Sequence, residues 1–297
     1  MSLQKTCFIV VKSMRPRQWT KNVLLLAGLL FSRHLLDSAS VQRALAGFVI
    51  FCLLSGATYL LNDLLDRERD QLHPRKRLRP IASGQLSIGA AILAMILIGL
   101  AGLAGAFALS SYFGLCALAY LLLMIPYSVA LKEVYLIDTI IIAMGFIIRA
   151  VSGVIVLRTP QTTVALTSWF VICVMFLALF LAFSKRRGER VMLNDNASAF
   201  RPVLGMYSLE MMDKVITISA GGAILSYMLY ATSRPDPWMM LTTLPFVIYG
   251  IFRYLHLVYN QQAGEAPEIV LTTDLQLLGC VVLWVLSLML VFFPSRF

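Results

Sequence analysis

The sequence predicts an all-α polytopic membrane protein, with about nine transmembrane helices in a bundle around a polar cavity that faces the cytoplasm. Three observations lead to this prediction. Hydrophobic residues make up 59% of the 297 residues and charged residues only 13%, roughly half of the charged fraction of a typical soluble domain. The mean hydropathy is +0.81. The apolar residues also gather in windows of about 20 residues, the length that an α-helix needs to cross a bilayer.

Nine such windows follow one another along the chain: 20–36, 43–62, 86–109, 112–131, 134–157, 164–184, 214–232, 238–259 and 271–293. The segment before them, residues 1–21, carries several lysines and arginines beside Trp19. Cations next to an aromatic ring are typical of a segment at the level of the lipid headgroups. We therefore expect an uncleaved interfacial N-terminal arm, and one membrane domain over residues 1–297.

Lysine and arginine residues are distributed unequally between the segments that connect the windows. If the N-terminus lies inside, 19 of them are on the inner side and five on the outer side, with Arg149 within the fifth window. The positive-inside rule then predicts a cytoplasmic N-terminus in a bacterial inner membrane. The charged segments 63–85 and 185–214 would face the cytoplasm together and border one cavity.

The remaining composition excludes several classes of function. The formal net charge is +10, but in a membrane protein basic residues serve orientation and contact with anionic headgroups, and no nucleic-acid module is present. The five cysteines are scattered without a CxxC pair, so we expect neither disulfides nor a zinc site. The three histidines are isolated, which argues against a Ser/His/Asp triad.

The most charged stretch of the chain runs from Asn62 to Gly84, NDLLDRERDQLHPRKRLRPIASG. Asp63, Asp66 and Asp70 are spaced i, i+3 and i+7, so they share one face if the preceding helix continues through them. Three carboxylates on one stripe repel one another unless a cation lies among them. Mg²⁺ prefers oxygen ligands and is commonly completed by substrate phosphates. The spacing therefore predicts a Mg²⁺-diphosphate site, with Asn62 at its edge.

Basic residues follow these carboxylates on the same loop, and two of them, Lys76 and Arg79, are candidates to hold phosphate oxygens. The alternative is a solvated loop whose cations set the topology and pair locally with the acids.

A second group of polar residues lies between Tyr127 and Gly153. Asp138 and Arg149 are eleven residues apart, about three helical turns, so they lie near one face of a helix. Ionisable residues at membrane depth are costly and normally point into a protein cavity. We expect Asp138 to add a carboxylate to the metal site, and Arg149 and Lys132 to meet phosphates. The alternative is that Asp138 lies at the interface and Arg149 pairs structurally.

The loop after the sixth window opens with SKRRGER, which contains Lys185, Arg186 and Glu189. It is either part of the same site or an ordinary positive-inside anchor. A last polar segment, 253–274, is interpreted as a solvated loop with interfacial tyrosines.

These residues resemble the UbiA-type intramembrane transferase superfamily, whose members join a polyprenyl chain to an acceptor with Mg²⁺ in a nine-helix bundle. The shared pattern is NDxxDxxxD followed by HPxKxxRPIASG, here between Asn62 and Gly84. The chain departs from the prenyl-diphosphate members after the sixth window, where SKRRGER stands in place of a second aspartate-rich motif. That departure puts a second Mg²⁺ cluster, and a prenyl-diphosphate donor, in doubt.

The chain looks more like the decaprenyl-phosphate phosphoribosyltransferase branch of that superfamily. The similarity covers MRPRQWTKN near the start, YSxxLK with IDxxxxxxGFxxRAxxG, KRxxE, and RYLxLV followed by PExxLxxD. The resemblance implies phosphoribosyl diphosphate as donor, a polyprenyl phosphate lipid as acceptor and Mg²⁺ as cofactor.

The chemistry of that reaction agrees with the residues. Both ends of the donor carry phosphate, which calls for metal-holding carboxylates and a separate basic cluster, and the ionised lipid phosphate needs no general base. We expect catalytic roles for Asp63, Asp66, Asp70 and Lys185, the three aspartates holding the metal. We expect substrate binding by Lys21, Asn62, Lys76, Arg79, Tyr127, Lys132, Asp138, Arg149, Arg186 and Glu189.

Two other functions remain as alternatives. An aromatic prenyltransferase of the same superfamily would need a working second metal motif. A membrane transporter would use Asp138 and Arg149 along a pathway and would favour inverted repeats with broken helices, which the sequence does not display.

Overall fold

The computed structural model describes residues 3–32, 34–74, 76–159, 164–193, 202–260, 270 and 273–292. Within these ranges the regular structure is helical throughout, and no strand is found. Eight helices or helix pairs are long and apolar enough to cross a membrane. They are α3 (Ser38–Leu65), α5 (Ile88–Leu109), α6 (Ser111–Val129), α7 (Ile137–Ile155), α8 (Ser168–Leu193), α11 (Leu209–Thr232), α12 (Pro237–Leu241) with α13 (Leu244–Asn260), and α15 (Leu275–Phe292). The prediction of an all-α membrane bundle is confirmed.

The first predicted window, 20–36, is not one continuous helix of spanning length. Its place is taken by a 3₁₀-helix, η1 (Pro16–Leu26), followed by the short helix α2 (Ala27–Phe31). A 3₁₀-helix rises about 2.0 Å per residue against 1.5 Å for an α-helix. The two pieces together therefore reach about 30 Å, which is the thickness of the hydrocarbon core.

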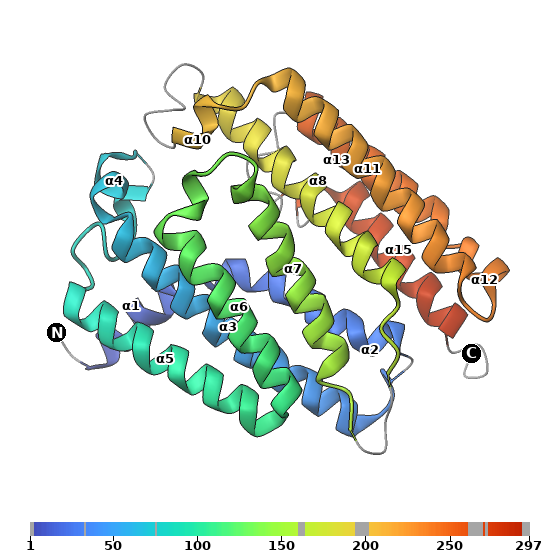
Figure 1. Cartoon of the computed structure of the whole chain (residues 1–297), viewed down its shortest axis with the longest axis horizontal. Helices are drawn as coiled ribbons and strands as arrows, with labels where there is room; N and C mark the ends of the chain where they lie inside the picture. Colours follow the sequence, from blue (N-terminus) through green and yellow to red (C-terminus); the bar gives the residue numbers. More distant parts are fainter. Residues whose placement is uncertain are drawn as a thin grey trace.

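The stretch formed by η1 and α2 runs from one end of the bundle to the other (Figure 1). Arg15, which precedes it, forms an ion pair with Asp63 near the C-terminus of α3. At the other end the ring of Phe31 lies 5.3 Å from the ring of Phe170, at the start of α8. The first predicted window thus still extends across the bundle, in a 3₁₀ conformation that hydropathy does not reveal.

Two glycines allow η1 and α2 to lie directly against α7. A Cβ atom on Gly153 would be 2.0 Å from the carbonyl oxygen of Leu25, and one on Gly28 would be 2.2 Å from that of Gly153. Neither backbone has room for a side chain, so small residues set this contact, as is common between membrane helices. The largest core cluster of the protein, which includes Leu25 and Leu29, surrounds this crossing.

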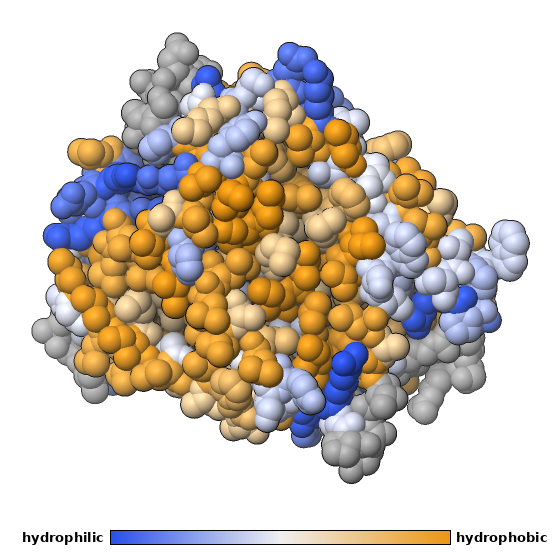
Figure 2. Space-filling view, viewed as in Figure 1, coloured by the Kyte–Doolittle hydropathy of each residue, from blue (hydrophilic) through white to orange (hydrophobic). Residues whose placement is uncertain are grey.

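Three short helices lie at one end of the bundle: α1 (Leu3–Ser13), α4 (Arg67–Leu72) and α10 (Pro202–Gly205) (Figure 1). Two further 3₁₀ turns, η2 (Lys76–Leu78) and η3 (Leu131–Glu133), belong to the connections at this end. Apolar residues cover the face over α5, α6 and α7, and hydrophilic residues gather around α4 (Figure 2). The side chains of Leu97 and Leu100 in α5 and of Leu122 in α6 are exposed, which fits contact with lipid.

Candidate functional site

The first two of the three aspartates lie where α3 ends and α4 begins. Asp63 belongs to the last turn of α3, Asp66 stands between the two helices, and Asp70 belongs to α4. The backbone N–H of Asp66 donates to the oxygen of Asn62 at 2.9 Å, and that of Asp70 to the oxygen of Asp66 at 2.8 Å. Helix-like hydrogen bonding thus continues through a break at Asp66.

Asp63 and Asp70 converge on one guanidinium. The Nη1 atom of Arg79 donates to Oδ1 of Asp63 at 3.1 Å and to Oδ2 of Asp70 at 2.6 Å. Arg15 also forms an ion pair with Oδ1 of Asp63. Both carboxylates are nearly inaccessible, with 2% and 3% of Asp63 and Asp70 exposed. Buried carboxylates need such partners, because an unpaired buried charge is very costly.

Asp66 takes a different set of partners. Its Oδ1 accepts from Nζ of Lys132 at 2.6 Å, and its Oδ2 from Nδ2 of Asn62 at 2.9 Å. Lys132 belongs to η3, the 3₁₀ turn between α6 and α7, so this ion pair links that connection to the end of α3. The predicted residues Asn62, Asp66 and Lys132 are therefore in direct contact.

The donor chemistry of the aspartates fits a divalent cation. Two carboxylates converge on one cationic nitrogen of Arg79, and carboxylate oxygens are the ligands that Mg²⁺ prefers. Over the described parts of the chain, however, no three His, Cys, Asp or Glu side chains form a group that could hold a metal ion. Asp66 faces Lys132 instead. Metal binding by all three aspartates stays a prediction, and it requires the Asp66 side chain to turn away from Lys132.

A second charged cluster is buried between α7, α8 and the segment before α11. Nε of Arg186 donates to Oδ2 of Asp138 at 2.8 Å, and its Nη1 to Oε2 of Glu189 at 2.7 Å. The hydroxyl of Tyr207 donates to Oδ1 of Asp138 at 2.7 Å. Burial, followed by the hydrogen bond to Asp138, raises the pKa of Tyr207, so the hydroxyl keeps its proton at neutral pH.

Asp138 is thus paired with a cation and a hydroxyl, and Arg186 is held between two carboxylates with only 3% of its side chain exposed. Tyr127 lies close enough to Arg186 to interact with it electrostatically. The structure brings together Tyr127, Asp138, Arg186 and Glu189, all of which the sequence selects, and it adds Tyr207.

Arg149 lies in a third and separate place. Its Nε donates to Oδ1 of Asn22 at 2.8 Å, its Nη2 to the hydroxyl of Tyr120 at 2.8 Å, and its Nη1 to the oxygen of Gly145 at 2.9 Å. The guanidinium carbon lies 4.7 Å from the ring centroid of Tyr120. The described contacts of Arg149 include neither the aspartates of α3 and α4 nor Asp138, and they agree with the alternative of a structural role.

The remaining selected residues have less defined surroundings. The backbone N–H of Lys76 donates to Nδ1 of His73 at 3.3 Å, which fixes the start of η2. Lys21 is in η1 and Lys185 is in α8, one residue before Arg186. Pro267 and Glu268 of the PExxLxxD pattern lie outside the described residues, and Asp274 pairs with Arg253, Nη2 to Oδ2, at 2.7 Å.

The selection from sequence misses Arg15, Asn22 and Tyr207. Arg15 and Asn22 belong to the MRPRQWTKN motif, from which only Lys21 is selected. The motif itself therefore marks both residues in the sequence. Tyr207 stands in a segment with no charge or motif to mark it, and only the fold brings it to Asp138.

The sequence profile of the UbiA prenyltransferase family matches residues 23–278. The chain belongs to this family. The match covers both the aspartate-rich stretch and the buried cluster around Arg186, so the two groups of residues lie within one family unit.

Curated relatives named decaprenyl-phosphate phosphoribosyltransferase match most of the chain. The one from Mycobacterium tuberculosis is 34% identical over 271 residues, which cover 88% of this chain and 87% of the relative. The one from Corynebacterium glutamicum is 32% identical over 297 residues, covering 95% and 86%. This UbiA-family protein is therefore an enzyme, a transferase.

A solved UbiA homologue from Archaeoglobus fulgidus, described as bound to GPP and Mg²⁺, has the same fold. It superposes with a TM-score of 0.74 at 20% identity, covering 96% of this chain and 99% of the homologue. At that identity the likeness establishes the UbiA-type fold, and the substrates must be argued from this chain's own residues.

Proposed function

We propose that this UbiA-family transferase moves 5-phosphoribose from phosphoribosyl diphosphate to a polyprenyl phosphate and releases diphosphate. The observation that carries the proposal is the similarity to the M. tuberculosis decaprenyl-phosphate phosphoribosyltransferase, 34% identical over 88% of this chain. The similarity spans most of both chains, 88% of this one and 87% of the relative.

Mg²⁺ is the cofactor that the donor set supports, with Asp63, Asp66 and Asp70 as its ligands. When bound, the ion would stabilise the charge of the leaving diphosphate. The A. fulgidus homologue described as bound to Mg²⁺ supports a metal in this family. Arg79 already lies between Asp63 and Asp70, so it is placed to neutralise a phosphate beside the same carboxylates.

The reaction requires positioning and charge stabilisation more than proton transfer. An oxygen of the lipid phosphate forms a bond to C1 of the ribose while the bond from C1 to the diphosphate oxygen breaks. The lipid phosphate is already ionised, so no base removes a proton. Lys132 and Arg79 are the cations next to the aspartates, and they stabilise the negative charge that develops on the leaving group.

The buried cluster around Arg186 replaces what would be a second carboxylate-metal site. Arg186 already occupies the position between the carboxylates of Asp138 and Glu189, where a second Mg²⁺ would have to bind. The cluster therefore argues against a second metal ion and, with it, against a prenyl-diphosphate donor. We place the site on the cytoplasmic side of a bacterial inner membrane, in accordance with the excess of basic residues in the segments on that side.

The test is transfer of label from donor to lipid. Purified protein in detergent is incubated with Mg²⁺, polyprenyl phosphate and phosphoribosyl diphosphate labelled in the ribose, and label is counted in the organic phase. We expect label in the lipid and its loss on addition of EDTA. Consumption of a labelled prenyl diphosphate with an aromatic acceptor, and no transfer of ribose, would instead support the prenyltransferase alternative. Movement of an intact solute across vesicles without diphosphate release would support a transporter.

A further inference from the structure

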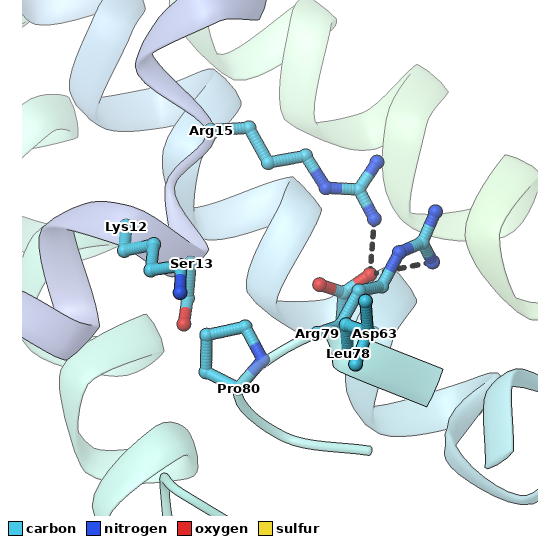
Figure 3. A pocket seen from close by; sticks show the side chains of 7 residues that line it. All are labelled: Lys12, Ser13, Arg15, Asp63, Leu78, Arg79 and Pro80. Atoms are coloured by element: carbon cyan, nitrogen blue, oxygen red, sulfur yellow. Dashed lines mark hydrogen bonds and ion pairs between the residues drawn. The ribbon is translucent and has the colours of Figure 1, made fainter. Parts of the chain in front are cut away.

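A cavity of about 240 Å³ opens between the N-terminal arm and the aspartate-rich stretch. Its lining residues are Lys12, Ser13, Arg15, Asp63, Leu78, Arg79 and Pro80. Figure 3 shows the side chains of Arg15 and Arg79 meeting at Asp63, with Lys12 and Ser13 on the facing arm. Three cationic side chains and one carboxylate border the cavity, so its lining carries a net positive charge that an anion would neutralise.

The backbone at Arg15 is held in an unusual conformation at this cavity. Its φ of 55° and ψ of 67° are left-handed, a region that costs a non-glycine residue roughly 1–2 kcal/mol. The strain turns the chain between the end of α1 and Pro16 and brings the guanidinium to Asp63. Strained residues of this kind cluster at functional sites. A glycine would adopt this left-handed conformation more easily. The presence of arginine therefore indicates that its side chain is needed at this position.

The size of the cavity indicates what it can hold. Pockets for complete small-molecule ligands measure about 300–1,000 Å³, so 240 Å³ accommodates a terminal group better than a whole donor. A phosphate monoester carries nearly two negative charges at neutral pH, and arginine and lysine are the residues that bind phosphate, arginine with two parallel hydrogen bonds.

We propose that Lys12 and Arg15 form the binding site for the 5-phosphate of the phosphoribosyl donor, with Arg79 between this site and the diphosphate. The inference rests on the proposed function and assigns one end of that donor. Asp63, at the border of the cavity, and Asp70, the second carboxylate bound to Arg79, would hold the metal and the diphosphate. Lys12 and Arg15 come from a different segment, the N-terminal arm, and so supply the separate basic cluster that a donor with phosphate at both ends requires.

Binding measurements without turnover test the proposal. The wild-type protein and the variants Lys12→Gln and Arg15→Gly are titrated calorimetrically with phosphoribosyl diphosphate, ribose 5-phosphate and inorganic diphosphate, each with Mg²⁺. Arg15→Gly suits the left-handed backbone, and Lys12 forms no ion pair among the described residues, so both variants are expected to fold. Each should weaken binding of the two 5-phosphate ligands at least tenfold and change that of diphosphate less than twofold.

Lys5→Gln is the matched control, because Lys5 is an exposed cation of the same helix α1 that does not line the cavity. An equal loss of affinity for the 5-phosphate ligands in Lys5→Gln would mean that the effect comes from the overall positive charge of the arm, and it would overturn the proposal. Equal weakening of diphosphate would show that the cavity holds the other end of the donor. If both variants bind the two 5-phosphate ligands as tightly as the wild type does, this inference is overturned, while the proposed function stands. Failure of the wild type to bind either 5-phosphate ligand would overturn it together with the proposed function.

Discussion

Asp66 differs from its two neighbouring aspartates because its carboxylate is the most accessible. Its side chain is 21% exposed, against 2% for Asp63 and 4% for Asp70. It also stands at the break between α3 and α4, where a side chain turns at little cost to helix packing. Of the three proposed ligands, Asp66 is therefore the one that changes partner most easily, from Lys132 to a metal ion.

Asp66→Asn should lower the rate of ribose transfer at least a hundredfold, because an amide ligates Mg²⁺ poorly. The volume of the side chain is unchanged. The melting temperature in detergent should stay close to that of the wild type, since Oδ1 of the asparagine still accepts the hydrogen bond that Nζ of Lys132 donates to Asp66. The transfer assay with labelled donor measures the first effect. Glu68→Gln, an exposed acid of α4, is the control. Wild-type activity in Asp66→Asn would remove the assignment of the metal site.

Tyr207 connects two elements through one hydroxyl. It donates to Asp138 and accepts from the backbone N–H of Leu136 at 2.9 Å. Leu136 has a φ of 64°, an outlier for a branched side chain. The hydroxyl therefore fixes a strained residue at the start of α7 and, through Asp138, the position of Arg186.

Tyr207→Phe should lower the free energy of unfolding by about 1–3 kcal/mol, because it leaves Asp138 and the N–H of Leu136 short of a partner. The pH dependence has a defined sign. The folded protein raises the pKa of Tyr207, so the hydroxyl contributes stability that is complete below the unfolded pKa of about 10 and is lost as the pH rises further. Melting temperatures at pH 8 and pH 10.5 should show a smaller alkaline decrease in Tyr207→Phe than in the wild type.

At the scale of elements, the contact between η1, α2 and α7 has the least tolerance for change. The backbone carbonyls of Leu25 and Gly153 fill the space where side chains would lie. Arg149 of α7 adds a hydrogen bond to Asn22 of η1 inside the bundle. A buried guanidinium with neutral partners is tolerated because its N–H groups are satisfied, and it ties the 3₁₀ segment to its neighbour.

Gly153→Ala should therefore destabilise the protein severely, because the added methyl group would lie 2.0 Å from the oxygen of Leu25 and the backbones would have to separate. We expect a fall of at least 10 °C in the melting temperature and poor yield from membranes. Gly221→Ala is the control, because a Cβ on Gly221 meets nothing within 4 Å. In a helix interior that change is neutral or stabilising by roughly 0.5–1 kcal/mol. Similar effects of the two changes would contradict the packing argument.

The elements that the sequence predicts well are those that depend on local composition. Apolar windows give the eight long helices. The spacing of Asp63, Asp66 and Asp70 places all three near the junction of α3 and α4, but it does not predict that Asp66 pairs with Lys132 while the other two share Arg79. Contacts between distant residues are a different matter, because no local pattern encodes them. The pairs Arg15 with Asp63 and Asp138 with Arg186 each join residues 48 positions apart. The 3₁₀ conformation of η1 was also unpredictable, since hydropathy measures length and polarity and not helix type.

At the scale of the whole molecule, the number of membrane crossings determines which connecting segments lie on the same side of the membrane. If η1 and α2 cross with the eight long helices, α1 and the turn before α12 lie on opposite sides of the membrane. In the fold, α1 and α4 lie toward one end of the bundle, and α2 and α12 lie toward the other end (Figure 1). The excess of lysine and arginine residues predicts that the end with α1 faces the cytoplasm.

Cysteine labelling tests this arrangement in one experiment. In a chain with all native cysteines replaced by serine except Cys7, which is exposed on α1, a membrane-impermeant maleimide should react only after the cells are permeabilised. In the cysteine-free chain carrying Pro235→Cys, in the exposed turn between α11 and α12, it should react with intact spheroplasts. Identical behaviour at both positions would mean that η1 and α2 do not cross, because removing one crossing brings the two positions to the same side. The reverse pattern would keep nine crossings but invert the molecule and move the aspartate site to the outer face, away from a cytoplasmic phosphoribosyl donor.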